Sequence, residues 1–185
     1  MVIRWQGVAI VGSVVAATVI PAGPASAWVD SRCGLWTATA SYRHASGLSS
    51  VYITANVDAK GLWNSNSDVN FVPAASGQTE KVYMTAYNVW SADYDGLWTA
   101  DDCNANGHSI GTVNVMLNRV YTDSYSSSGK KQVMVHELGH AIGLGHTGSA
   151  SCSGQPIMYG SSDRYFTCGH IAPQTDDING ANALV

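Results

Sequence analysis

Hydrophobic and polar residues alternate along several short stretches of this chain, with the period of two that is typical of β-strands. The alternation is clearest over residues 112–118, with the sequence TVNVMLN. Residues 68–72 and 81–90 also fit strands, the latter being rich in Val, Tyr, Met and Thr, and residues 35–42 are similarly β-rich. We therefore predict four strands at these places.

Three helices are predicted between and after these strands. The first begins at Ser49 or Ser50, either of which can cap it, and is expected to end near Gly61. A loop rich in Ser and Gly at 124–129 leads to the second, and Thr175 can cap the third. The apolar positions of the first helix run toward Trp63, and they are Tyr52, Ile53, Val57 and Leu62.

The second predicted helix carries the candidate chemistry, in the sequence HELGHAIGLGH at residues 136–146. His136 and His140 are four residues apart, so on a helix they project from one face at a spacing that suits two ligands of one zinc ion. Gly143 can adopt a positive φ, which lets the chain turn and bring His146 to the same ion. Chance spacing of ordinary histidines is the alternative, and the extended pattern makes it much less common.

Glu137 is the candidate catalytic residue. It lies about 100° around the helix from His136, so it can point at the open side of the metal, where a general base is needed. Zinc with three neutral ligands lowers the pKa of a bound water to about 7. Glu137 would take a proton from that water as it attacks a carbonyl, and then deliver the proton to the leaving amine.

The extended motif resembles that of the metzincin zinc endopeptidases and is most similar to the matrixin branch. Met158, in the sequence QPIMYG, lies where these proteins have a methionine turn beneath the zinc ligands. Astacins and serralysins have a tyrosine two residues after that methionine, whereas Tyr159 follows it directly here. Residues 173–184 are similar to the last matrixin helix. The resemblance implies an α+β fold, with a twisted, mainly parallel sheet, about three helices and a zinc cleft under an edge strand.

The chain also departs from the matrixin pattern. Animal matrixins have a His-x-Asp-rich segment for a structural zinc and for calcium, whereas residues 93–102 are acidic without that histidine pattern. Calcium could bind there, although an Asp-rich loop is more often a solvated turn. Gly160 replaces the proline that follows Met-Tyr in many matrixins. The isolated histidines are expected to be ordinary surface or core residues, and they are His44, His108 and His170.

Two aspartates in the predicted last helix have two explanations. In matrixins the ammonium group of the mature N-terminus can pair with an aspartate of this helix, and Asp176 and Asp177 hold the matching place for the ammonium of Trp28. The helix dipole also favours acidic residues in a first turn without any partner.

The N-terminal residues 1–27 predict export from the cell. Arg4 precedes an apolar run at 8–20, and small residues lead to an Ala-Ser-Ala cleavage site at Ala27. The run is too short to span a bilayer, so no membrane anchor is expected, and residues 28–185 would form a single catalytic domain. The chain has a formal net charge of −4 and no cluster of basic residues. Both features argue against nucleic acid as a partner.

Four cysteines in an exported chain predict two disulfides, with three possible connectivities. We favour Cys152 with Cys168, closing a loop around the methionine turn, and Cys33 with Cys103, tying the N-terminal segment to the body. Arg-Cys-Gly at Cys33 is also similar to the cysteine switch of matrixin propeptides. That alternative would leave one cysteine unpaired.

The prediction is a secreted, extracellular zinc-dependent endopeptidase that acts on polypeptides as a monomer. One alternative is an amidase acting on cell-wall cross-links. Another is a secreted zinc-binding module that recognises proteins without cleaving them. The presence of Glu137 argues against the binding module, because zinc binding alone has no use for a carboxylate there that is not a ligand.

Overall fold

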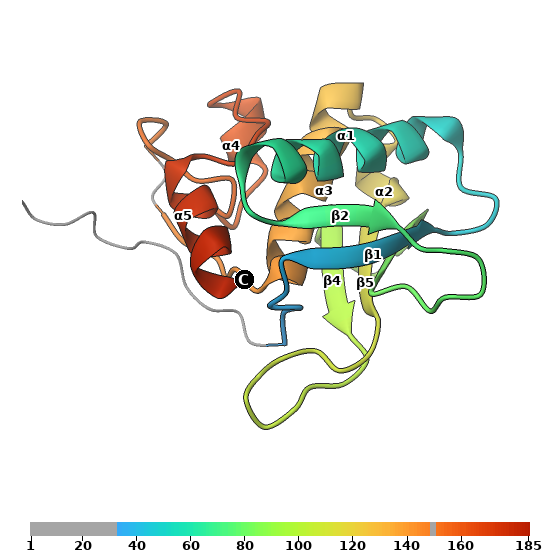
Figure 1. The fold of residues 1–185 in the computed structure, drawn as a ribbon. Helices are drawn as coiled ribbons and strands as arrows, with labels where there is room; N and C mark the ends of the chain where they lie inside the picture. Colours follow the sequence, from blue (N-terminus) through green and yellow to red (C-terminus); the bar gives the residue numbers. More distant parts are fainter. Residues whose placement is uncertain (1–32, 149–150) are drawn as a thin grey trace, which may run out of the picture.

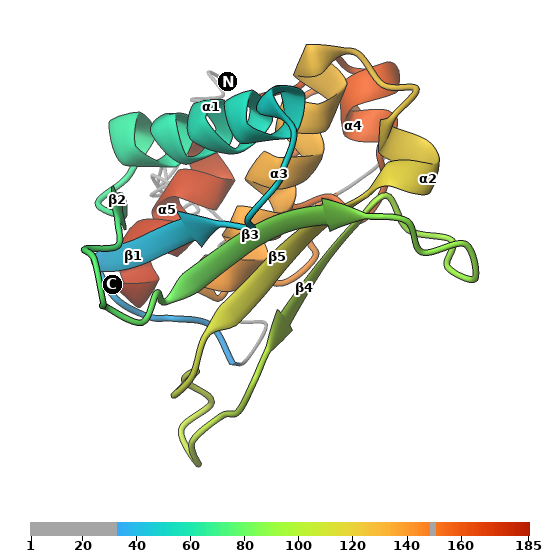
Figure 2. The same ribbon diagram turned by 90° about the vertical axis from the view of Figure 1, so that its right-hand side faces the viewer.

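The computed structural model describes residues 33–148 and 151–185, and within them five strands form one sheet (Figures 1 and 2). The order across the sheet is β2-β1-β3-β5-β4. Four strands pair in parallel, and β4 pairs antiparallel with β5 at one edge. The predicted α+β class with a mainly parallel sheet is confirmed. The strands are β1 (Thr39–His44), β2 (Asn70–Pro73), β3 (Val82–Tyr87), β4 (Gly96–Ala100) and β5 (Val113–Asn118).

Three longer helices accompany the sheet, and α1 and α3 lie side by side on the same face of it (Figure 2). The core fills the space between them and the sheet, and Trp63 of α1 is fully buried there. Its indole Nε1 donates a hydrogen bond to the carbonyl of Val135 in α3 at 2.9 Å, which satisfies the indole N–H in the core. The helices are α1 (Ser50–Asn66), α2 (Arg119–Thr122), α3 (Ser127–Ile142), α4 (Asp163–Phe166) and α5 (Thr175–Leu184).

The first helix begins where the sequence predicts, with Ser49 as its N-cap residue, but two details differ. It continues past Gly61 to Asn66, since no side chain crowds that glycine and nothing breaks the helix there. Val57 is 40% exposed and does not belong to the buried face, which recurs every three or four residues at Tyr52, Ala55, Ala59 and Trp63.

The predicted strands differ from the observed ones where other contacts compete for the backbone. Strand β1 begins at Thr39, later than predicted. Strand β3 ends at Tyr87, and the Asn118 side chain pairs with both the N–H and the carbonyl of Val89 beyond it. The acidic segment 93–102 contains the unpredicted strand β4, whose central residues suit a strand although acids flank them.

The N-terminal end of the described chain is fixed to the end of α3. Leu35 and Trp36 donate backbone hydrogen bonds to the carbonyls of Ala141 and Ile142, at 2.8 and 3.3 Å. A Cβ atom on Gly34 would lie 2.2 Å from the Cα of Gly143, so a larger residue would push the two segments apart. These contacts to α3 explain why residues 35 and 36 do not join the sheet.

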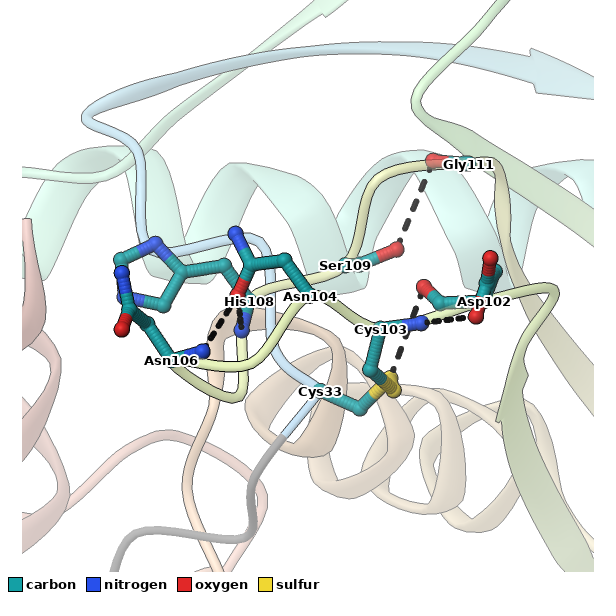
Figure 3. Close-up of a disulfide and its surroundings, with 8 residues drawn as sticks. All are labelled: Cys33, Asp102, Cys103, Asn104, Asn106, His108, Ser109 and Gly111. Atoms are coloured by element: carbon teal, nitrogen blue, oxygen red, sulfur yellow. Dashed lines mark hydrogen bonds between the residues drawn. A yellow bond between two sulfur atoms is a disulfide. The ribbon is translucent and has the colours of Figure 1, made fainter.

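Two disulfides are present, joining Cys33 to Cys103 and Cys152 to Cys168, which is the pairing favoured above. Figure 3 shows the first one linking the N-terminal segment to the loop between β4 and β5. In that loop the Asn104 side chain accepts hydrogen bonds from the backbone N–H groups of Asn106 and His108. The cysteine-switch alternative for Cys33 is wrong, because its sulfur is bonded to Cys103.

The predicted signal segment 1–27 lies outside the described residues. Within the described part of the chain, no helix has the length and apolar character needed to cross a bilayer.

Candidate metal centre

Helix α3 carries the first part of the candidate site. It begins after Ser126, whose hydroxyl accepts a hydrogen bond from the N–H of Gly129 at 3.1 Å and so caps the helix. It ends at Ile142, and the C-cap residue Gly143 has a φ of 128° and donates to the carbonyls of Gly139 and His140. This is a conformation that side chains rarely permit, and it lets the chain leave the helix toward His146.

The structure brings His136, His140 and His146 together through one nitrogen of each ring. Their three Nε2 atoms lie 3.0–3.1 Å from one another. Two ligands of a tetrahedral zinc ion with bonds of about 2.0 Å are separated by about 3.3 Å, so the triangle fits one such ion. Within the described ranges, no other group of three or more potential metal ligands is found.

Hydrogen bonds to the opposite ring nitrogens orient two of these imidazoles. The Nδ1 atom of His136 lies 2.8 Å from the carbonyl of Ile157, and that of His140 lies 2.7 Å from the carbonyl of Leu144. A carbonyl accepts a hydrogen bond, so each Nδ1 carries the proton and each Nε2 presents its lone pair to the metal.

Burial keeps the three imidazoles neutral. It lowers the pKa of all three histidines, that of His136 well below 6.5 and that of His140 to about 4. The positive charge of Arg164 acts in the same direction on each of them. Neutral imidazole is the form that binds zinc, so the rings need not lose protons to bind metal at neutral pH.

Met158 lies directly beneath the helix that carries the histidines. A Cβ atom on Gly139 would lie 2.3 Å from the Met158 sulfur, so the side chain packs against the backbone of α3 between His136 and His140. The Met158 carbonyl accepts a hydrogen bond from the N–H of Thr147 at 3.1 Å, one residue after His146. The methionine turn therefore contacts both the helix and the segment that carries the third histidine.

Asp177 of α5 holds this turn from below. One carboxylate oxygen accepts from the N–H of Ile157 at 2.7 Å, and the other accepts from the N–H of Met158 at 3.1 Å. A third bond comes from the N–H of Gln174, which is the N-cap of α5 in place of the predicted Thr175. The carboxylate is thus occupied by backbone donors, and the proposed ammonium partner, Trp28, lies outside the described residues.

Glu137 is buried beside the triad, at the bottom of a cleft between α3 and the edge strand β4. Burial raises the pKa of Glu137 to about 8, the charge of Arg164 lowers it, and that of Asp95 raises it. The positive charge of a bound zinc ion, like that of Arg164, would lower the pKa of Glu137. Gly96 makes the close approach possible, because a Cβ there would lie 2.5 Å from Oε1 of Glu137.

Two charged residues in this cleft, Asp95 and Arg164, are not predicted from the sequence as part of the site. Asp95 accepts hydrogen bonds from the hydroxyls of Tyr125 and Ser162. Arg164 is almost completely buried and lines the same pocket as Glu137. Asp95 lies in the acidic segment 93–102 and Arg164 belongs to no motif, and the positions of both beside the triad depend on how distant segments pack.

The remaining histidines do not join the cluster. His44 lies 3.2 Å from the Asn56 amide, His108 packs against Trp36, and His170 lies 3.0 Å from the Cys152 carbonyl. In the acidic segment, Asp101 accepts from Asn114, and Asp102 accepts from the N–H of Cys103. Calcium binding there stays a prediction.

Comparison with known proteins supplies the family. Residues 53–185 match the family model described as Matrixin. The chain belongs to the matrixin family. Matrixins are zinc metalloendopeptidases, so the resemblance and the enzyme class predicted from the histidine motif are confirmed.

Individual relatives of this matrixin are distant. A 52-residue segment is 46% identical to part of a protein of Spodoptera frugiperda ascovirus 1a named "Putative matrix metalloproteinase". That segment is 28% of this chain and 12% of the viral protein, so most of the relative has no counterpart here. Among solved structures, a chain of the "GM1 bound form of the ECX AB5 holotoxin" has a TM-score of 0.57 at 13% identity. The alignment covers 86% of this matrixin and 88% of that chain, and it shows a shared fold alone.

Proposed function

We propose that this matrixin is an exported zinc-dependent endopeptidase in which Glu137 acts as the general base. One observation carries the proposal: the buried carboxylate of Glu137 lines the same open cleft as three imidazoles whose Nε2 atoms are 3.0–3.1 Å apart. Three histidine ligands without a neighbouring base or a cleft would be compatible with a purely structural zinc site. The adjacent carboxylate and the cleft suit catalysis.

His136, His140 and His146 would hold the zinc ion through Nε2. When bound, the ion supplies a Lewis acid that activates water and stabilises the oxyanion formed from the scissile carbonyl. The carbonyls of Ile157 and Leu144 hold two of the ligand rings in the orientation that this requires.

Glu137 would move the proton. Its carboxylate takes a proton from the attacking water and later passes it to the departing amine nitrogen. Burial raises the pKa of Glu137 to about 8 without metal, and the charge of a bound zinc ion would lower that pKa, so Glu137 can both accept and donate a proton near neutral pH. Gly96 keeps the strand close above the carboxylate, which limits the positions that Glu137 can take.

The edge strand β4 would bind the polypeptide. One side of β4 pairs with β5, and its residues Gly96, Leu97 and Trp98 line the cleft together with Glu137. A substrate in extended form could pair antiparallel with its free edge, so that backbone hydrogen bonds hold any sequence across the zinc. Binding through the backbone of a chain is what distinguishes an endopeptidase from an enzyme of small amides.

Digestion of casein by the secreted protein tests the proposal. We expect hydrolysis that a chelator abolishes and added zinc restores. Glu137→Gln should retain stoichiometric zinc and lose activity by several orders of magnitude, whereas His140→Ala should lose the metal. Metal loss in Glu137→Gln, or retained turnover, would contradict the role of Glu137.

The same assays separate the alternative functions. Cleavage of cell-wall cross-links with no cleavage of casein would favour the amidase, and zinc binding without either activity would favour the recognition module.

Export is a separate part of the proposal. It is supported by the apolar segment at 8–20 with the Ala-Ser-Ala sequence after it, by two disulfides in the structure, and by the typical secretion of matrixins. Residues 28–185 would then form the catalytic domain. Sequencing the N-terminus of the secreted protein should give Trp28 as the first residue.

A further inference from the structure

Arg164 is a buried cation with an incomplete set of partners. The side chain lies in α4 and is 2% exposed. Its Nη1 donates to the carbonyl of Tyr159 at 2.9 Å, whereas its Nε is buried without a hydrogen-bond partner. Among the described residues, no carboxylate lies within ion-pair distance of the guanidinium. An unpaired buried charge is costly, so an acceptor that reaches this guanidinium would bind strongly.

The guanidinium lines a pocket next to the candidate catalytic atoms. The pocket has a volume of about 410 Å³ and is lined by Arg164 together with His136, Glu137 and His146. Its other walls come from the segment before and at the start of β4, from Tyr121 and Tyr125, and from the segment after Met158. A side chain of a bound substrate could therefore enter it from the scissile bond.

Of the carboxylates that the structure describes, none in or near this pocket forms a direct ion pair with Arg164. The Asp95 carboxylate is held by the hydroxyls of Tyr125 and Ser162. Asp95, Glu137 and Asp177 act on Arg164 only through space. Asp93 is exposed at the rim. Burial lowers the pKa of Arg164 to about 10, so the group keeps its positive charge at neutral pH.

The direction of β4 indicates which substrate residue would reach the pocket. The pocket includes the start of β4, at Gly96, and the residues before it. A second hollow, which shares Glu137 and His146 with the first and includes His140 as well, extends further along the strand to Trp98. A peptide antiparallel to β4 runs from Trp98 toward Gly96, so the residue that follows the scissile bond faces the Arg164 pocket.

We propose that Arg164 makes this protein select substrates with Asp or Glu immediately after the scissile bond. The inference rests on the proposed endopeptidase function and gives it a substrate class. The incoming carboxylate would accept charge-assisted hydrogen bonds from the guanidinium, including the Nε that has no partner. A cationic side chain would be repelled, and an apolar one would leave that donor unsatisfied.

Cleavage of a mixed peptide library by the zinc-loaded protein, followed by mass spectrometry, gives the residue on each side of every cut. Matched fluorogenic peptides then differ at one position, with Glu, Gln, Asp, Asn, Leu or Lys after the bond. We expect kcat/KM about 10- to 100-fold higher for Glu than for Gln and for Asp than for Asn, as is typical of hydrogen bonds to charged groups. This comparison needs no variant, so it does not depend on whether a substitution at Arg164 folds.

Variants then test whether Arg164 is the cause. Arg164→Gln should bring the Glu-to-Gln ratio close to one while zinc content is kept, and Arg164→Lys should retain part of the preference. Arg43→Gln is the matched control, because Arg43 lies on the surface in an ion pair with Glu80 at 3.0 Å, outside the residues that line the cleft. It should leave the ratio unchanged.

Each outcome bears on one of the two proposals. Equal cleavage of the Glu and Gln peptides, or a preference for Lys or Leu, overturns the selectivity and leaves the endopeptidase intact. An acidic preference that survives in a folded, zinc-bound Arg164→Gln overturns the role of Arg164. Zinc binding with no peptide cleaved at all overturns the endopeptidase proposal itself.

Discussion

The carboxylate of Asp177 accepts a hydrogen bond from the backbone N–H of Met158 at 3.1 Å. It also accepts from the N–H of Ile157, whose carbonyl in turn accepts from Nδ1 of His136. The last helix is thereby connected to a candidate zinc ligand through a single residue of the methionine turn. Replacing this carboxylate should affect both stability and metal binding.

Asp177→Asn is expected to destabilise the protein. An amide has one acceptor oxygen, so its NH₂ group would face a backbone N–H that now has no acceptor, at a cost of about 2–3 kcal/mol. Zinc affinity should also fall, because the Ile157 carbonyl that orients His136 would shift. Urea unfolding and competition with a chelator measure the two effects. Asp58→Asn is the control, since that exposed carboxylate is 3.8 Å from Lys131 and should change stability by less than about 1 kcal/mol. Equal effects of the two substitutions would contradict the assignment.

Gly96→Ala is expected to reduce activity more than zinc content. The added Cβ would lie 2.5 Å from Oε1 of Glu137 and 2.6 Å from Val133, so either the carboxylate or the edge strand must move. Gly61→Ala is the matched control, because a Cβ there meets no atom within 4 Å inside α1. That substitution should stabilise the protein by about 0.5–1 kcal/mol. Activity and bound zinc are measured for both variants relative to the wild type. Full activity in Gly96→Ala would contradict the prediction, because it would mean that the added Cβ does not displace the Glu137 carboxylate.

The two disulfides should contribute unequally to stability. They close loops with sequence separations of 70 and 16 residues. In the chain-entropy description the longer loop contributes about 4 kcal/mol and the shorter about 3 kcal/mol. Replacing Cys33 and Cys103 together by Ser should therefore cost more than replacing Cys152 and Cys168. Mass mapping of the unreduced protein should find both linked peptides and no free thiol, and any other pairing would refute the assignment.

His140 should make the metal-free protein less stable in acid. The unfolded chain takes up a proton on this imidazole near pH 6.5, whereas burial lowers the folded pKa to about 4. Because the unfolded state binds more protons in this interval, stability is lost as the pH falls from about 6.5 toward 4. Burial raises the pKa of Glu137 and of Asp177, and these groups act in the opposite direction.

A comparison with His140→Gln isolates that contribution, since Glu137 and Asp177 are common to both proteins. Between pH 7 and pH 5, the chelator-treated wild type should lose about 2 kcal/mol of unfolding free energy relative to the variant. Denaturant titrations at several pH values measure this difference. A difference that does not change with pH would show that His140 titrates normally in the folded protein.

The histidine cluster follows from local geometry, which is why the sequence was sufficient to predict it. Two residues four apart on a helix share a face whatever the rest of the chain does, and Gly143 permits the turn that brings in His146. The same argument gives Glu137 its place beside the ligands. The alternating strands and the capped start of α1 are also local signals.

Tertiary packing alone decided what surrounds that cluster. Asp95, Asp177 and Arg164 come from three separate segments, and no periodicity or motif relates them to the histidines. Strand β4 was not predicted because acidic residues flank it, and its place at the edge of the sheet depends on pairing with β5. The sequence therefore determined the candidate metal ligands and base through backbone geometry over a few residues. The shape and charge of the cleft depend on contacts between distant segments, which a local pattern cannot encode.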